Sequence, residues 1–113
     1  MFHIGLKYAI AGLIVALKTE RNIKIHFCAA CFVVILGILT EISTVEWAII
    51  FLTIGSVISM ELINTSLERA LDYIEPNNQQ AIGIAKDLAA AAVLISAIIS
   101  VFVACCIFLP KWI

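Results

Sequence analysis

The chain has 113 residues, of which 64% are hydrophobic and only 13% are charged, and its mean hydropathy is +1.15. Soluble domains have roughly 45–50% apolar and about 25% charged residues, so this composition is typical of a membrane protein and excludes an ordinary soluble domain. The net charge of −1 and the lack of a basic tract exclude a nucleic-acid-binding surface. We therefore expect a single membrane-embedded domain over residues 1–113 and no nucleic-acid partner.

The first predicted helix covers about residues 1–19 and is amphipathic. Small residues recur on one of its faces at helical spacing, at Gly5, Ala9, Gly12 and Ala16. This stripe predicts that another element approaches the helix closely. The helix itself is expected to lie on the membrane surface.

Three longer apolar segments follow and are predicted to cross the membrane. They cover about residues 23–40, 44–75 and 81–109. Ser43 or Thr44 can cap the second of them. That second helix has about 30 residues and a length of roughly 45 Å, which exceeds a ~30 Å hydrocarbon core, so one of its ends must protrude. Pro76 is expected to end it, and Pro110 is expected to end the last span.

The basic residues predict the orientation of the spans. Six of the seven lie on one side of the membrane, namely Lys7, Lys18, Arg21, Lys24, Arg69 and Lys86. Lys111 alone lies on the other side. Because basic loops stay in the cytoplasm, the N-terminus and Asn78 are expected inside the cell and Ser43 outside.

Two common kinds of site are missing from the sequence. The five glycines never form a phosphate-binding loop of the G-x-x-x-x-G-K or G-x-G-x-x-G type. Cys28-x-x-Cys31 has no second Cys or His pair at a zinc-like spacing. All four cysteines lie within or beside apolar runs and are expected to pack as small hydrophobic side chains; they are Cys28, Cys31, Cys105 and Cys106.

Polar residues recur on one face of the second span. They are Glu61, Asn64, Glu68, Asp72 and Glu75, separated by three, four, four and three residues. Like charges at this spacing repel, so the face requires a cation, a proton or a basic partner. Glu75 alone fits a solvated helix end. Glu61 follows fourteen largely apolar residues, and an ionisable group at such depth predicts a function.

Other charged residues lie on the same side of the membrane, at Glu20 and at the pair Lys86-Asp87. Carboxylates with one lysine suit phosphoryl transfer, since Mg²⁺ is held by one or two carboxylates together with phosphates, and a lysine neutralises the transferring group. A carboxylate at bilayer depth is suitably placed to act as a base for an acceptor hydroxyl.

Two strings in the second and third spans closely resemble the prokaryotic diacylglycerol kinase family. Residues 61–72 follow E-L-x-N-[ST]-x-x-E-x-x-x-D and residues 85–95 follow A-K-D-x-A-x-A-A-V-L-I, which are signatures of that family. The resemblance extends from about Phe2 to Lys111. It implies an all-α homotrimer of three-span subunits, each with an N-terminal surface helix, that uses ATP and Mg²⁺ to phosphorylate a membrane lipid alcohol.

Matching positions imply residue roles. The resemblance makes Glu61 the catalytic base and makes Glu20 and Glu68 the metal ligands. The residues that it implies for ATP binding are Tyr8, Glu20, Glu68, Lys86 and Asp87. Asn64 and Asp72 are expected to support the site, and Trp47 and Ala90 to contact the lipid together with Glu61. A family arginine that precedes the tyrosine would fall at Met1 and is missing.

The lipid acceptor is suggested by further strings, including residues 18–22 and 107–111, which resemble the Gram-positive branch of the family. That branch phosphorylates mainly undecaprenol, so we expect undecaprenol first and diacylglycerol second, at a bacterial cell membrane with the site facing the cytoplasm. A small proton-coupled transporter with Glu61 as the carrier is an alternative from another class, and a non-enzymatic assembly subunit is a third. The clustering of acids with Lys86 at one end, away from midspan, argues against the transporter.

Overall fold

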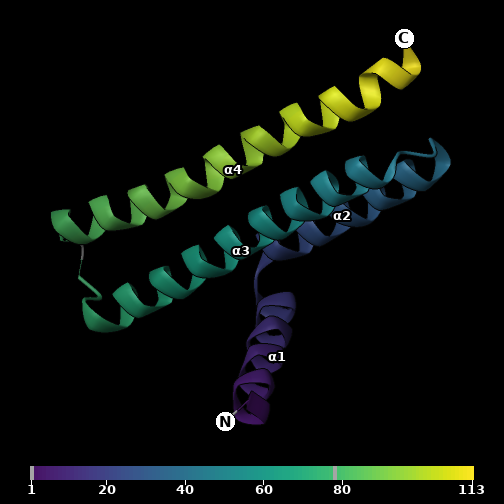
Figure 1. The fold of residues 1–113 in the computed structure, drawn as a ribbon. Helices are drawn as coiled ribbons and strands as arrows, with labels where there is room; N and C mark the ends of the chain where they lie inside the picture. The colour runs from purple at the N-terminus through teal and green to yellow at the C-terminus, as the bar shows by residue number, and fades with distance from the viewer. Residues whose placement is uncertain (1, 78) are drawn as a thin grey trace.

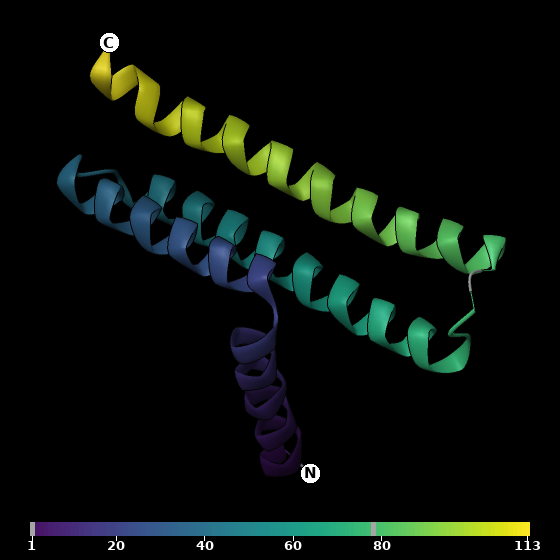
Figure 2. The ribbon, with the colours of Figure 1, turned by 180° about the vertical axis from the view of Figure 1, so that it is seen from behind.

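The computed structural model describes residues 2–77 and 79–113, and these residues form four α-helices. In chain order they are α1 (Phe2–Thr19), α2 (Arg21–Leu39), α3 (Thr44–Ile74) and α4 (Gln80–Trp112). Helices α2, α3 and α4 run side by side with alternating direction and with α3 in the middle, whereas α1 leaves the bundle at a steep angle (Figures 1 and 2). Within the described residues, α2, α3 and α4 are each long and apolar enough to cross a membrane. Asn78, expected inside the cell, lies outside the described residues, as does Met1.

The three helices of the bundle differ in length. Helix α2 has 19 residues and α3 has 31, a difference of 12. At 1.5 Å per residue, that difference is about 18 Å. Because α2 and α3 share the turn at residues 40–43, the first residue of α2 lies beside the body of α3, and the last part of α3 continues past it (Figure 1). We call the end with the 40–43 turn the Thr40 end. The opposite part of the bundle, from the level at which α1 branches off to the Pro76 loop, we call the charged end.

The turn after α2 is a helix-ending motif closed by two backbone hydrogen bonds. The Ile42 N–H donates to the Gly37 carbonyl and the Glu41 N–H donates to the Ile38 carbonyl, both at 3.3 Å. Glu41 has a φ of +53°, the left-handed conformation that this motif requires and that glycine adopts most readily. Glu41 therefore occupies a position at which glycine would be less strained.

Helix α3 begins at a capping box. The Glu46 N–H donates to Ser43 Oγ at 3.2 Å, and the Ser43 N–H donates to Glu46 Oε1 at 2.9 Å. This arrangement satisfies two of the free N–H groups at the start of a helix. The predicted cap at Ser43 is confirmed. Lys111 Nζ lies 3.3 Å from Glu46 Oε1, so the last turn of α4 is tied to the first turn of α3.

The prediction that Pro110 ends the last span is wrong, because α4 continues to Trp112. A proline inside a helix loses one N–H donor and crowds the carbonyl of the preceding turn. Pro110 stands in the final turn, where the Ile113 N–H still donates to the Leu109 carbonyl at 3.1 Å. The proline is tolerated because little helix remains beyond it.

The apolar core lies at the Thr40 end. Its buried members are Ile42, Ile50, Ile107 and Phe108, contributed by the turn, α3 and α4. Trp47 packs over Gly37 of α2, where an added Cβ would come within 2.8 Å of the indole ring. Gly37 therefore lets α2 and α3 approach closely at this end.

Most of the outward surface of the spans is apolar. Only 11–28% of the most hydrophobic window of each span is buried within the chain. Two predictions from the sequence are corrected here. All four cysteines are exposed on this surface instead of packed inside the chain. Of the small-residue stripe on α1, Ala16 is buried, but no atom from another element would lie within 4 Å of a Cβ at Gly5 or Gly12. Close packing against α1 is thus limited to its last turn, because α1 diverges from the bundle.

Candidate functional site

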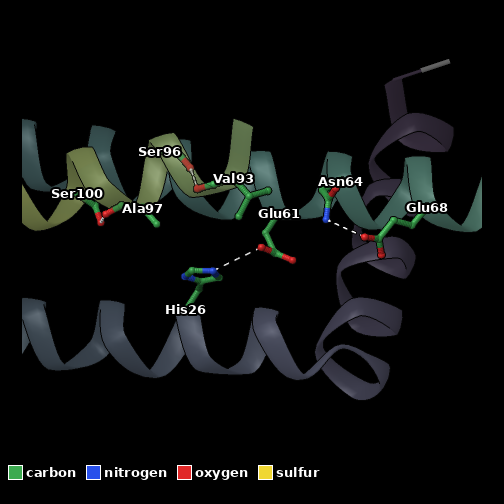
Figure 3. A network of polar contacts seen from close by, with 8 residues as sticks. All are labelled: His26, Glu61, Asn64, Glu68, Val93, Ser96, Ala97 and Ser100. Atoms are coloured by element: carbon green, nitrogen blue, oxygen red, sulfur yellow. Dashed lines mark hydrogen bonds and ion pairs between the residues drawn. The ribbon is translucent and has the colours of Figure 1, made fainter. Parts of the chain in front are cut away.

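Glu61 projects from α3 toward α2 and is 4% exposed (Figure 3). Its Oε2 lies 3.5 Å from Nε2 of His26 on α2. The contact arises because α2 and α3 are antiparallel and joined by the short turn at residues 40–43, which brings His26 near the level of Glu61. A buried carboxylate next to an imidazole is a group that can hold or transfer a proton.

Asn64 lies one turn beyond Glu61 on the same face and is 8% exposed. Its Nδ2 donates to Glu68 Oε1 at 3.4 Å (Figure 3). Its Oδ1 is buried and has no hydrogen-bond donor among the described residues. Buried polar atoms are nearly always satisfied in folded proteins, so this amide oxygen beside two carboxylates has an acceptor position free for a bound group.

Arg69 connects the charged end of α3 with the junction of α1 and α2. Its Nη2 donates to Thr19 Oγ1 at 2.8 Å and pairs with the Glu20 carboxylate. The pair brings Glu20 to the same end of α3 that carries Glu68. Both predicted metal ligands therefore lie at the charged end, Glu20 against Arg69 and Glu68 against Asn64.

Lys86 of α4 pairs with Asp72 of α3. The two residues face each other across the hairpin formed by the Pro76 loop, so Lys86 stands at the charged end as the sequence predicts. Asp87 is exposed beside it. Glu75 accepts a hydrogen bond from the Asn77 N–H at 3.1 Å and serves the turn.

Two cavities flank this face of α3. The first, of about 220 Å³, lies among α2, α3 and α4 on the membrane side of Glu61; its walls include His26, Ala30, Val57 and Val101, and we call it the intramembrane cavity. The second, of about 490 Å³, lies between α1 and α3. It is lined by Tyr8, Gly12, Thr65, Ser66 and Arg69, among others, and we call it the α1–α3 cavity.

Not every predicted site residue reaches this region. Trp47 lies fourteen residues before Glu61, roughly 21 Å away along α3, and packs at the Thr40 end. The structure does not bring it to the carboxylates. Ala90 is exposed on α4, three residues after Asp87. Neither residue lines the intramembrane cavity.

Carboxylates at the charged end are the oxygen donors that could hold Mg²⁺. Residues 2–77 and 79–113 contain no group of three or more His, Cys, Asp or Glu side chains arranged to hold a metal. Glu20 and Glu68 offer one carboxylate each, and the unpaired Asn64 Oδ1 lies beside Glu68. One or two carboxylates fit Mg²⁺, which is usually held by so few protein ligands together with phosphate oxygens and water.

Two residues in this region were not identified as site residues from the sequence. His26 belongs to no motif in the sequence, and Arg69 contributes there only a positive charge to the predicted orientation. Counting back equal numbers of residues from the 40–43 turn places His26 about one helical turn from the level of Glu61, so its position could have been found. No comparable signal in the sequence links Arg69 to Glu20.

Comparison with known proteins identifies the family of this chain. The prokaryotic diacylglycerol kinase family matches residues 7–108. The undecaprenol kinase of Bacillus subtilis is 45% identical over 110 residues, which cover 97% of this chain and 89% of that protein. A diacylglycerol kinase of Synechocystis is 36% identical over 95% of this chain and 62% of its own length, and one of Haemophilus influenzae is 28% identical over 94% and 83%. With a family match over nearly its whole length and a charged site at one end of three apolar helices, this chain belongs to the prokaryotic diacylglycerol kinase family.

Proposed function

We propose that this lipid kinase transfers the γ-phosphate of ATP to the hydroxyl of undecaprenol and forms undecaprenyl phosphate. The observation that carries the choice of lipid is the 45% identity to an undecaprenol kinase over 97% of the chain. Diacylglycerol is the second candidate acceptor, supported by the Synechocystis and Haemophilus relatives.

Glu61 is proposed as the base that accepts the proton of the lipid hydroxyl as its oxygen attacks the γ-phosphorus. Its burial keeps it in the apolar layer, where the hydroxyl of a membrane lipid can reach it. Glu68 lies seven residues further along α3, about 10 Å nearer the charged end. The two carboxylates are therefore suited to different tasks, Glu61 to the acceptor and Glu68 to the phosphates.

The nucleotide is proposed to bind at the charged end, at the corner formed by α3 and the junction of α1 with α2. Glu20 and Glu68 would hold Mg²⁺, which when bound neutralises charge on the phosphates. Lys86 and Asp87 stand at the start of α4, and Tyr8 lines the α1–α3 cavity. An exposed aromatic ring there offers a surface for a nucleobase. Asn64 and Asp72 support the site by pairing with Glu68 and Lys86.

The chain of the lipid is proposed to enter the intramembrane cavity. His26 stands at the cavity next to Glu61, and the remaining walls are almost wholly apolar. A lipid in this place would present its hydroxyl to Glu61 while its chain stays among α2, α3 and α4.

The assembly is proposed to be a homotrimer, with α1 on the membrane surface and the charged end in the cytoplasm. The extensive outward apolar surface and the gathering of basic residues at the charged end support this arrangement. Single cysteines introduced as Thr44→Cys and Asn77→Cys, in a variant without the native four, should be labelled from opposite sides of the membrane. Labelling of both from one side would overturn the orientation.

The function is tested with purified protein in mixed micelles, labelled ATP and Mg²⁺, and undecaprenol or diacylglycerol as acceptor. We expect label in both lipids, with a higher kcat/KM for undecaprenol. A higher kcat/KM for diacylglycerol would reverse the order of acceptors. Failure of a folded protein to label either alcohol would refute the proposal.

A further inference from the structure

Arg69 makes the contact that joins the α1–α2 junction to α3. Its partners Thr19 and Glu20 are 50 and 49 residues away in the sequence. The Arg69 side chain is 50% exposed and that of Glu20 is 29% exposed. Ion pairs at such exposure contribute little to stability, so structural support alone is a weak explanation for an arginine in this position.

The guanidinium also lies at the wall of the α1–α3 cavity. Among the described residues that line this cavity, Arg69 is the only one with a charge. The other polar groups there are the Tyr8 phenol and the hydroxyls of Thr65 and Ser66. A cavity with one cation, hydroxyl donors and an aromatic ring has the chemistry to bind a phosphorylated aromatic ligand.

We propose that Arg69 is a nucleotide-binding residue that exchanges Glu20 for phosphate. Without nucleotide, its guanidinium neutralises the Glu20 carboxylate. When Mg²⁺ and ATP bind, Glu20 turns to the metal and Arg69 to the terminal phosphates. This inference rests on the proposed function, which places the nucleotide at this corner.

The physical basis is the shared geometry of carboxylate and phosphate. Arginine stays protonated and presents a planar fork of donors that pairs with either group. Before the metal binds, the negative charge of the Glu20 carboxylate is balanced by the Arg69 guanidinium, which can move away when Glu20 binds the metal. Arg69 follows Glu68 directly on α3, so the two side chains start at nearly the same level of the helix and lie on neighbouring faces of it.

The first test measures equilibrium binding of a non-hydrolysable ATP analogue with Mg²⁺ to the detergent-solubilised protein. Arg69→Gln should weaken binding about 10-fold, the loss expected for one charge-assisted hydrogen bond, and adenosine binding should not change. Arg69→Lys should lose less. Arg21→Gln is the matched control, because it removes an exposed arginine next to Glu20 and should leave affinity unchanged. Thr19→Val removes only the hydroxyl contact and should also have little effect.

A second test uses ATP without metal. Glu20→Gln frees the guanidinium, so it should strengthen the binding of metal-free ATP. This gain, measured against the wild type, should exceed the gain of the Glu20→Gln/Arg69→Gln double variant measured against Arg69→Gln. Equal gains in these two comparisons would mean that Arg69 only anchors the junction. Equal loss of analogue binding in Arg69→Gln and Thr19→Val, in the first test, would mean the same. Phosphorylation of lipid by the wild type is measured in parallel. Its absence counts against the proposed function, whereas unchanged nucleotide binding by Arg69→Gln in an active kinase refutes this inference alone.

Discussion

The two ends of the bundle use polar side chains in different ways. At the Thr40 end they complete the backbone, since Ser43 and Glu46 cap α3 and Lys111 joins α4 to the same cap. At the charged end they face one another between helices, and the buried Asn64 Oδ1 has no partner in the part of the chain that the structure describes.

This difference separates stability from function along one helix. Satisfied polar groups and a packed core hold α2, α3 and α4 together at the Thr40 end. Departures from such local consistency are expected where a protein binds or reacts. Helix α3 takes part in both regions. Variants at its charged end should lower turnover more than stability, and variants at its Thr40 end should change stability more than turnover.

The largest effect is expected at Glu61. Glu61→Gln keeps the shape of the side chain but cannot accept a proton, so turnover should fall at least about 10²-fold while ATP binding survives. Glu46→Gln is the matched control, with the same change near the other end of α3, and should keep near-normal turnover. Steady-state kinetics at saturating lipid measure both variants. Near-normal turnover in Glu61→Gln would make Asp87 the next candidate for the base.

The next effect concerns the two carboxylates proposed to bind metal. Glu20→Gln and Glu68→Gln should each raise the Mg²⁺ concentration for half-maximal rate at least about 10-fold, the scale on which even supporting groups alter metal affinity. Titration of Mg²⁺ at fixed ATP measures the shift. Glu75→Gln serves as the control, because Glu75 accepts from its own turn. Unchanged titrations in both variants would remove these residues from the metal site.

At the Thr40 end, Gly37→Ala should destabilise the fold. The new Cβ would lie 2.8 Å from the Trp47 ring and 3.1 Å from Ile42, and overpacking of this kind costs about 1–3 kcal/mol. Unfolding in detergent, followed by circular dichroism, measures the loss. Gly55→Ala is the control, because no atom from another element lies within 4 Å of a Cβ there. Equal stability of the two variants would show that the helices can separate at this end without cost.

The smallest effect is a gain at Glu41. Its φ of +53° suits glycine, so Glu41→Gly should raise the free energy of unfolding by about 1 kcal/mol without altering kinase activity. Thr40→Gly, one residue earlier at a φ of −95°, should instead be destabilising. A loss of stability in Glu41→Gly would mean that its side chain compensates for the strained backbone.

The helices were predictable because their signals are local. Long apolar runs, the cap at Ser43 and the break at Pro76 are each encoded within a few residues. The predicted segments 23–40, 44–75 and 81–109 correspond to α2, α3 and α4, and the main error, at Pro110, came from treating a proline in a last turn as a stop. The apolar run before Glu61 singled this residue out, and its side chain is buried within the chain, where it contacts His26.

The contacts between helices were not predictable in the same way. The pairing of Arg69 with Glu20 depends on the level at which α2 begins beside α3, which reflects the relative lengths of two helices. The pairing of Lys86 with Asp72 depends on how the Pro76 loop closes. The sequence predicts that the carboxylates as a group need cationic partners. Which cation pairs with which carboxylate depends on how the helices are aligned with one another in the structure.

The shortness of α2 relative to α3 has a consequence for how a lipid is handled. Helix α2 begins about 18 Å short of the last residue of α3, and this difference forms a step on the side of the bundle. Glu61 is buried near the level of this step. If the step stands at the headgroup layer, a long polyprenol can diffuse sideways to it while its chain remains dissolved in the bilayer. Lifting such a chain into water would cost about 0.8 kcal/mol for each CH₂ group, and a step at that level would avoid this cost. Its specificity would then concern only the few carbons nearest the hydroxyl, however long the remainder of the chain.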